Sequence, residues 1–223
     1  EIMPSLVGSE MCIRDRSSFR LGVPGSGKSF SVKEEIVFLI LNTDDDILIA
    51  DPEGEYAPLI EAMDGLGAVI RVAAGGKDRL NAMYMVDGYG ENNPIVVKSQ
   101  FIMSLVERID PKGVGAKQKS IIDRCTASVY RTYQQNDYTG QVPTLQDFRD
   151  ELLKQDEPEA KEIALAIELF THGSLNTFAK QTNVDTHNRL ICYDILDLGK
   201  QLMPIGMLVV LDSILNRITQ TRA

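Results

Sequence analysis

The chain has 223 residues, of which 43% are hydrophobic and 25% charged, an ordinary composition for a globular protein of one large or two small domains. Its formal net charge of −9 argues against a domain whose whole surface grips nucleic acid, although a local basic patch is compatible with it. The three cysteines show neither metal-ligand nor disulfide spacing, and no apolar run approaches the roughly 20 residues of a membrane span, so we expect a reducing cytoplasm and no transmembrane segment.

The first sixteen residues, EIMPSLVGSEMCIRDR, show no hydrophobic periodicity and no signal-peptide core. They resemble a translated sequencing adapter, so we expect residues 1–16 to be a non-native leader; a genuine disordered leader is the alternative. If the leader is non-native, only Phe19–Leu21 remains of the strand that should enter the loop described next. We expect residues 17–92 to form the first part of an α/β core.

A phosphate-binding motif follows, with the spacing G-x-x-x-x-G-K-S of a Walker A loop. Its glycines let the backbone turn tightly and aim N–H groups at a polyphosphate, and the following helix adds its positive dipole end. We expect Lys28 to act in catalysis by reaching the β- and γ-phosphates of ATP, and the Ser29 hydroxyl to complete the shell of Mg²⁺. A glycine-rich turn with an incidental lysine is the alternative. The expected nucleotide-binding residues are Gly22, Val23, Pro24, Gly25, Ser26, Gly27, Lys28, Ser29 and Phe30.

Hydrophobic patterns after this loop alternate between helix and strand. The periodicity predicts a helix over Phe30–Leu41, and the compact apolar run Ile47–Asp51 predicts a buried parallel strand. After a turn at residues 52–56, a helix is expected over Tyr56–Met63 and a second strand over Ala68–Val72. Strands that alternate with helices indicate an α/β fold with a mostly parallel sheet.

Residues 93–185 change to an almost wholly helical pattern, in which Thr144 and Asp147 stand at the spacing of a capping box. Because Arg189–Ile195 is again a strand that needs a sheet to join, we interpret this segment as an all-α bundle inserted in the sheet domain; a separate C-terminal domain is the alternative. Residues 186–223 return to the core and end in a helix over Met207–Ile218. The bundle helices are expected over Ile95–Ile109, Gln118–Tyr133, a segment that starts at Pro143, and Glu159–Phe170.

Six stretches of the chain together resemble one family. They are LGVPGSGKSFSVKEEI, ILIADPEGEYAPL, KDRLNAMYM, QKSIIDRCTASVY, GSLNTFAKQTNVDTHNRLICYDILDLGKQL and MLVVLDSILNRI. Over most of Phe19–Ala223 the chain is similar to the C-terminal motor domain of the conjugative-transfer ATPases of the TraC, TrbE and VirB4 class, which power type IV secretion. The DPEGEY run by itself is typical only of the wider HerA- and FtsK-like group. The resemblance implies a RecA-like P-loop NTPase fold with a helical insertion, and ATP and Mg²⁺ as cofactors.

The same resemblance implies partners and a location. It implies that the full-length protein forms a hexameric ring with itself and works with a type IV secretion channel and its coupling proteins. The transported substrate, protein or DNA, stays open. The implied location is the cytoplasm, peripheral on the inner face of a bacterial cell membrane.

Two features depart from the family pattern. Leu80-Asn81-Ala82 stands where relatives often have Leu-Asn-Pro. The family's Walker B strand, sensor segment and trans-acting arginine should follow a segment like Ser213–Ala223, so we expect this chain to stop before them and its sheet to be incomplete at both ends. Val209–Asp212 mimics an apolar strand that ends in aspartate, but a helical leucine spacing continues through it, so a helix is favoured.

Acidic residues at strand ends are the remaining catalytic candidates. The resemblance places the strand that ends at Asp51 beside the P-loop strand, so Asp51 is a candidate Mg²⁺ ligand, and Glu55 is a candidate general base that polarises water. The alternative is that both acids cap the following helix. Asp194 ends another strand near the carboxyl edge of the sheet, where we favour a turn role.

These observations lead to one leading hypothesis and two alternatives. We expect an ATP-binding motor fragment of an ATPase that energises conjugative transfer or type IV secretion. Because Walker B normally helps to hold Mg²⁺, we expect this chain to bind nucleotide weakly and to hydrolyse it very slowly. A HerA-like DNA translocase is the first alternative, and a nucleotide-gated assembly module without turnover is the second.

Overall fold

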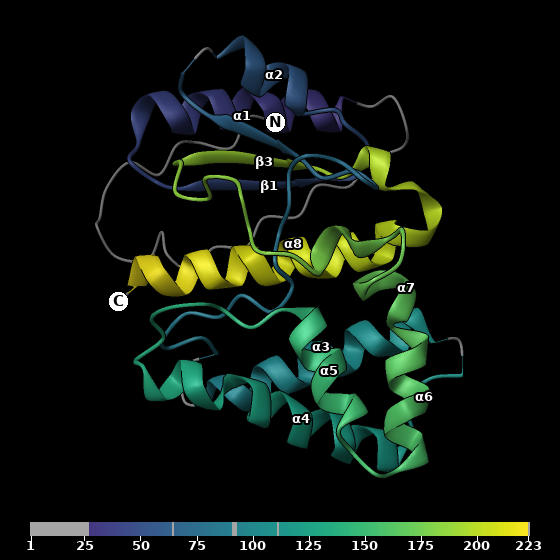
Figure 1. Ribbon diagram of the computed structural model, residues 1–223. Helices are drawn as coiled ribbons and strands as arrows, with labels where there is room; N and C mark the ends of the chain where they lie inside the picture. The colour runs from purple at the N-terminus through teal and green to yellow at the C-terminus, as the bar shows by residue number, and fades with distance from the viewer. Residues whose placement is uncertain (1–26, 64, 91–92, 111, 223) are drawn as a thin grey trace.

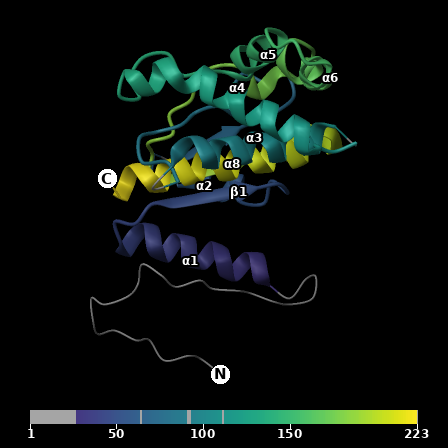
Figure 2. The same ribbon diagram turned by 90° about the horizontal axis from the view of Figure 1, so that it is seen from below.

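The sheet and a body of helices lie on opposite sides of one long helix (Figure 1). The computed structural model describes residues 27–222 except 64, 91–92 and 111. The leader and most of the Walker A loop therefore lie outside the described residues. Figure 2 shows the layers in succession, with α1 (Lys28–Asn42) outermost, then the sheet, then α8 (Gly199–Arg222) beside α3 (Pro94–Ile109), and then the helices of residues 116–166.

The described sheet has three strands in the order β1-β3-β2, and both pairs are parallel. The strands are β1 (Ile47–Asp51), β2 (Ala68–Arg71) and β3 (Leu190–Asp194). β3 lies in the centre although it comes last in the chain, and its first four residues are buried. The parallel sheet confirms the predicted α/β class. The strand expected at Phe19–Leu21 lies outside the described residues.

Two helices cover one face of the sheet, as Figure 1 shows. They are α1 (Lys28–Asn42) and α2 (Ala57–Ala62), each within two residues of the range predicted from the sequence. Apolar side chains at helical spacing on α1 and α2 meet the sheet in a small core of their own. Its buried residues are Ile36, Ile40, Ala57, Ile60, Leu190 and Cys192.

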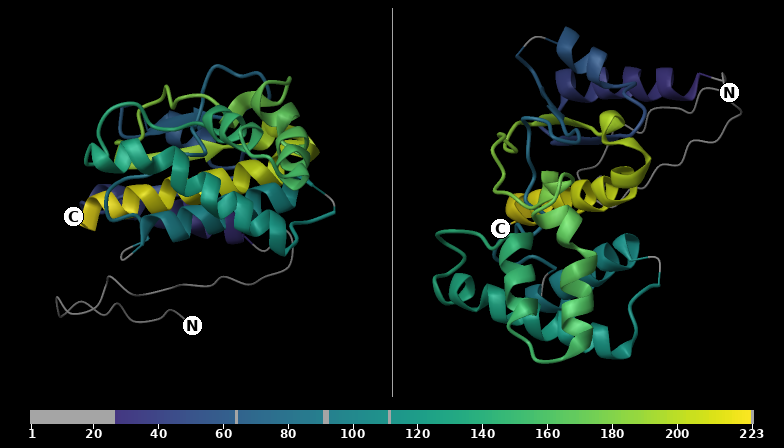
Figure 3. Two further views of the ribbon diagram at one scale, coloured as in Figure 1. Left: turned by 60° about the horizontal axis from the view of Figure 1, so that its bottom comes forward. Right: turned by 45° about the vertical axis from the view of Figure 1, so that its right-hand side comes forward.

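The helices between β2 and β3 form a second body, which we call the helical body. They are α3 (Pro94–Ile109), α4 (Ala116–Gln135), α5 (Leu145–Leu153), α6 (Pro158–Ala166) and α7 (Glu168–Thr171). The predicted capping box of α5 is present: the Asp147 amide donates to Thr144 Oγ1 at 3.3 Å, and the Thr144 amide donates to Asp147 Oδ2 at 2.7 Å. The right-hand view of Figure 3 shows this body on the far side of α8 from the sheet.

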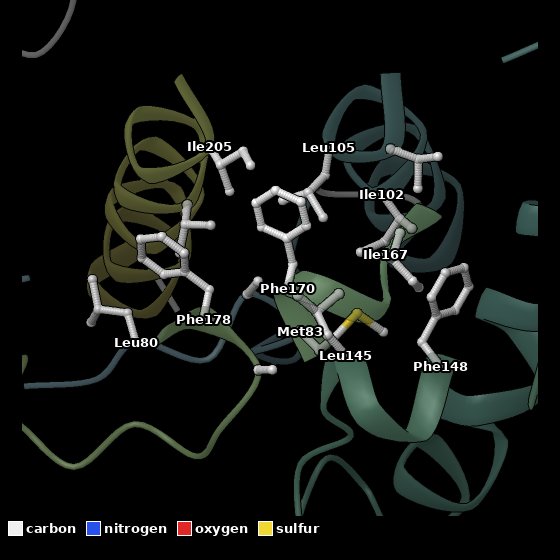
Figure 4. Packing of buried hydrophobic residues seen from close by; sticks show 14 of the residues in the cluster. Leu80, Met83, Ile102, Leu105, Leu145, Phe148, Ile167, Phe170, Phe178 and Ile205 are labelled. Atoms are coloured by element: carbon white, nitrogen blue, oxygen red, sulfur yellow. The ribbon is translucent and has the colours of Figure 1, made fainter. Parts of the chain in front are cut away.

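One large core runs from the helical body to α8 and the sheet. Figure 4 shows part of it, where Phe170 of α7 lies between Ile205 of α8 and Leu105 of α3. The chain leaves the sheet after β2 and returns as the central strand β3, so the helical body is encoded between two strands that pair with each other. This arrangement ties the helical body to the sheet through a shared core.

The last helix, α8 (Gly199–Arg222), begins eight residues earlier than the sequence pattern predicted. Pro204 lies inside it and removes one backbone hydrogen bond, but burial of the apolar side chains around the proline offsets that loss. Asp212 lies within this helix, which confirms that Val209–Asp212 is not a strand.

By length and composition, Leu196–Thr221 is the one helical segment of the described chain that could cross a membrane, with a mean hydropathy of 1.4. The segment is not uniformly apolar, because Asp212 within it forms a buried ion pair with Lys98 of α3. The segment lies between the sheet and the helical body (Figure 1), and 39% of its most apolar stretch is buried.

Candidate functional site

The first turn of α1 follows a glycine, which has no side chain to cap the helix. Gly27 precedes the helix with φ +81°, a left-handed conformation that favours glycine, and a Cβ added there would face open space. The helix is closed locally by the Ser31 amide, which donates to the Gly27 carbonyl at 3.0 Å. The amides of Lys28, Ser29 and Phe30 therefore lie at the positive end of the helix dipole, an arrangement suited to an anion.

Two contacts fix the direction in which α1 runs. Lys33 Nζ lies 5.7 Å from the ring centroid of Tyr56, which follows the carboxyl end of β1. At the other end of α1, Arg189 Nη2 donates to the Ile40 carbonyl at 3.4 Å, and Arg189 directly precedes β3. α1 is therefore antiparallel to the strands, and its first turn lies at their carboxyl edge (Figures 1 and 2), where open α/β sheets bind ligands.

Asp51 organises the turn between β1 and α2. Its side chain is buried, and its Oδ1 and Oδ2 accept hydrogen bonds from the amides of Glu55 at 3.1 Å and Tyr56 at 2.8 Å. These bonds stabilise the turn before α2 and hold the exposed Glu55 at the carboxyl edge. They do not cap the helix, because α2 begins at Ala57 with no side-chain cap hydrogen bond and no acidic residue in its first turn. The adjacent Cys192 thiol lies 3.8 Å from Asp51 Oδ2, and burial, aided by that carboxylate, raises the pKa of Cys192 to about 12.

Asp194 ends β3 in register with Asp51, so two carboxylates end neighbouring strands. Asp194 Oδ1 accepts a hydrogen bond from the Leu196 amide at 3.2 Å, and Arg71 Nε lies 3.8 Å from its Oδ2. This contact confirms the turn role favoured for Asp194. Asp194 thus stabilises the exit from β3 beside the Glu55 turn.

Comparison with known proteins agrees with this geometry. The family model for the central domain of the helicase HerA matches residues 21–218. The chain belongs to this family. The solved structure of VirB4 of Thermoanaerobacter pseudethanolicus has a similar fold, with a TM-score of 0.73 and 18% sequence identity over 88% of this chain and 77% of that chain. A search of curated protein sequences finds no match.

Family and fold together confirm two predictions from the sequence. Membership of the HerA-like group, which the DPEGEY run indicated, is confirmed by the family model. The α/β P-loop NTPase fold is confirmed by the similarity to VirB4 and by the parallel sheet. For a HerA-family chain of this fold, the first turn of α1 is the place where nucleotide phosphates would lie.

The site residues fit ATP and Mg²⁺ chemically. The described residues 27–30 supply a glycine in the left-handed region, a lysine, a serine hydroxyl and the first-turn amides of a helix. Within the described chain, no group of three or more His, Cys, Asp and Glu residues is placed to hold a metal ion.

Sequence reasoning missed a buried polar cluster away from this edge. Lys98 on α3 and Asp212 on α8 form an ion pair with Nζ and Oδ2 2.7 Å apart, and the lysine side chain is fully buried. One signal was available, because Lys98 stands on the apolar face of the predicted helix Ile95–Ile109, four residues before Ile102. Nothing local to the sequence named its partner.

Proposed function

We propose that this chain binds ATP·Mg²⁺ at the first turn of α1 and is the motor portion of an ATPase that energises conjugative transfer or type IV secretion. The first turn of α1, with Gly27-Lys28-Ser29 at the carboxyl edge of a parallel sheet, is the observation that carries this proposal. In this proposal the backbone N–H groups of the Walker A motif, which Pro24 lacks, bind the phosphates, Lys28 reaches the β- and γ-phosphates, and the Ser29 hydroxyl joins the Mg²⁺ shell.

The turn after β1 supplies the hydrolytic groups of the proposal. Glu55 is exposed at the carboxyl edge and its backbone is held by Asp51, so it is placed to orient a water as general base. Asp51 Oδ2 accepts from the Tyr56 amide and the Cys192 thiol, while Oδ1 accepts only from the Glu55 amide and is the oxygen proposed to join the Mg²⁺ shell through a bound water.

The proposed assembly follows from the family and the fold. Six copies form a ring, in the cytoplasm against the inner face of the bacterial membrane, and act with a secretion channel and its coupling proteins. The similarity to VirB4 supports this choice through the fold. The helical body, residues 93–185 in our division of the chain, is the part that moves relative to the sheet.

A HerA-like DNA translocase is the second candidate, because the matching family model describes the central domain of the helicase HerA. Stimulation of ATP hydrolysis by duplex DNA in the full-length protein would favour translocation. A nucleotide-gated assembly module is the third candidate. A nucleotide-dependent change of oligomer size without phosphate release would favour it.

Calorimetric titration with ATP and Mg²⁺ tests the proposed site. We expect Lys28→Ala to weaken ATP binding at least tenfold, about 1.4 kcal/mol, because it removes the phosphate-facing cation. Lys161→Ala removes an exposed lysine of α6 and serves as the control, with unchanged affinity. Equal ATP affinity of Lys28→Ala and the unmodified chain would contradict the proposed site.

A further inference from the structure

A buried polar network joins the helical body to α8. Lys98 Nζ donates to Asp212 Oδ2 at 2.7 Å and to the Tyr84 carbonyl at 2.7 Å, and the Tyr89 hydroxyl donates to Asp212 Oδ1. Lys98 also lies over the ring of Tyr89, 4.6 Å from its centroid. Burial lowers the pKa of Lys98 and raises that of Asp212, while the pairing opposes both shifts. The ion pair and the hydrogen bonds around it offset the cost of burying the two charges.

Asn216, one helical turn after Asp212, completes the network. Its Nδ2 donates to Asp212 Oδ2 and to the Tyr84 carbonyl, both at 3.2 Å, and its Oδ1 accepts from the Val86 amide at 3.0 Å. The segment after β2, α3 and α8 thus share one set of satisfied hydrogen bonds. Sliding α8 along α3 would separate buried charges, which costs far more than sliding one apolar surface over another.

The segment just before α8 contacts the turn that carries Glu55. A Cβ added to Gly54 would lie 2.9 Å from Leu196 Cδ2, so this glycine packs directly on Leu196 of the short helix η2 (Leu196–Leu198). The Ile195 amide donates to the Asp51 carbonyl at 3.1 Å. The Glu55 turn and the chain that leads into α8 are therefore in direct contact.

The short helix η2 is in turn packed tightly on α8. A Cβ added to Gly206 would lie 2.1 Å from Leu198 Cδ1 and 3.4 Å from the Phe178 ring. Leu198 therefore packs directly against the backbone of α8 at Gly206, with no gap between them. We expect a displacement of η2 to be passed on to α8 through this contact.

We propose that α8 carries nucleotide-dependent movement from the Glu55 turn to the helical body, and that the Lys98–Asp212 pair is the latch by which α8 moves that body. The inference rests on the proposed function, because the movement starts with nucleotide at α1. α8 spans about 20 Å from its first residue to Asp212 at the usual helical rise. A rigid helix with one closely packed end and one charged latch transmits a shift over that distance.

Hydrogen–deuterium exchange of the full chain, with and without a non-hydrolysable ATP analogue and Mg²⁺, tests the latch. The test variant is Lys98→Met with Asp212→Leu, which removes the charges but keeps apolar volume, a change that buried ion pairs often tolerate. The matched control is Arg124→Met with Glu157→Gln, which removes an ion pair between α4 and the cap of α6 inside the helical body. Circular dichroism checks that each variant is folded.

In the unmodified chain and the control, we expect nucleotide to slow exchange at least twofold both at residues 52–56 and in α3. In the latch variant, the protection at residues 52–56 should remain and the response of α3 should fall by at least half. A full α3 response in the latch variant, or protection at residues 52–56 without any α3 response in the unmodified chain, would overturn the latch.

Failure of the proposed function has a different signature, because calorimetry would then show no nucleotide binding to the unmodified chain, and the latch would fall with it. Where the latch variant does not fold, Leu198→Ala tests the same path by loosening the contact between η2 and Gly206. It should likewise keep the protection at residues 52–56 and lose at least half of the α3 response. An undiminished α3 response in that variant would overturn the proposal.

Discussion

The carboxyl edge of the sheet and the junction between α3 and α8 are built in opposite ways. At the carboxyl edge, the first-turn amides of α1 lie at the positive end of the helix dipole, and Phe30 (66%) and Glu55 are exposed. At the junction, Lys98 and Asp212 are buried and each finds a partner inside the protein. The edge presents polar groups to solvent, whereas the polar groups of the junction form hydrogen bonds with one another.

The difference teaches where substitutions should act. Polar groups that await a ligand add little to the stability of the free chain, so changing them should alter binding. Polar groups that are buried and paired are costly to orphan, so changing one of them should alter the free energy of unfolding. Measuring both quantities for each variant separates the two regions.

Asp212→Ala should give the largest effect. It leaves the Lys98 ammonium buried without its carboxylate, and breaking a buried pair in this way costs about 3–5 kcal/mol of unfolding free energy. Urea denaturation followed by circular dichroism measures the loss. The double variant Lys98→Met with Asp212→Leu should recover most of it, because no orphaned charge remains.

The exposed pair between Lys117 and Glu159 is the control for this comparison. Removing it with Lys117→Met should leave the urea midpoint unchanged, because solvent screens a surface pair. A loss of unfolding free energy below about 1 kcal/mol for Asp212→Ala would show that water reaches the junction, and would contradict its description as buried.

Asp51→Asn tests the carboxyl edge of the sheet. The amide group turns one acceptor into a donor that faces a backbone N–H, so the turn loses one charged hydrogen bond and should be less stable by about 2 kcal/mol. Calorimetry with ADP, with and without Mg²⁺, should also show a smaller gain of affinity from the metal.

Asp194→Asn, at the paired position of β3, is the control for the metal effect, which it should leave intact. If Asp51→Asn lowers stability but keeps the full Mg²⁺-dependent gain in ADP affinity, Asp51 only stabilises the turn after β1. That result would remove Asp51 from the proposed metal site and leave Ser29 there.

Gly206→Ala tests the contact between η2 and α8. The added methyl group meets Leu198, and such overpacking costs about 1–3 kcal/mol, partly offset by the higher helix propensity of alanine. We expect a net loss of about 1–2 kcal/mol in urea denaturation. In a Leu198→Ala background the same change should become stabilising, because the clash is gone and the propensity gain remains. Equal effects in both backgrounds would contradict a tight contact.

The parts of the fold that the sequence predicted are those set by neighbours in the chain. The apolar run Ile47–Asp51 has the bounds of β1, because a short buried strand is bounded by polar residues. The start of α8 was placed too late, because Pro204 and Gly206 are poor helix formers whose cost is offset only by packing against distant residues.

The functional residues also divide into those set by neighbours in the chain and those set by distant residues. The glycine, lysine and serine at α1 were identified because their spacing alone specifies a phosphate loop. The partner of Lys98 was not, because Asp212 lies 114 residues away and only the path of the chain through the helical body brings them together. The central position of β3 was hidden for the same reason, since its partners lie more than 100 residues earlier.

Thr144→Ala should give the smallest loss and isolates a purely local interaction inside the helical body. The Thr144 hydroxyl accepts the Asp147 amide within one turn of α5, so its removal should cost about 0.5–1 kcal/mol of unfolding free energy. Thr144→Ser keeps the hydroxyl and should lose less. Because the cap lies away from both the α1 edge and the α3–α8 junction, nucleotide affinity and the α3 exchange response should stay unchanged. A change in either would mean that any loss of stability in the helical body alters the nucleotide response, and the junction variants would then have to be compared at matched stability.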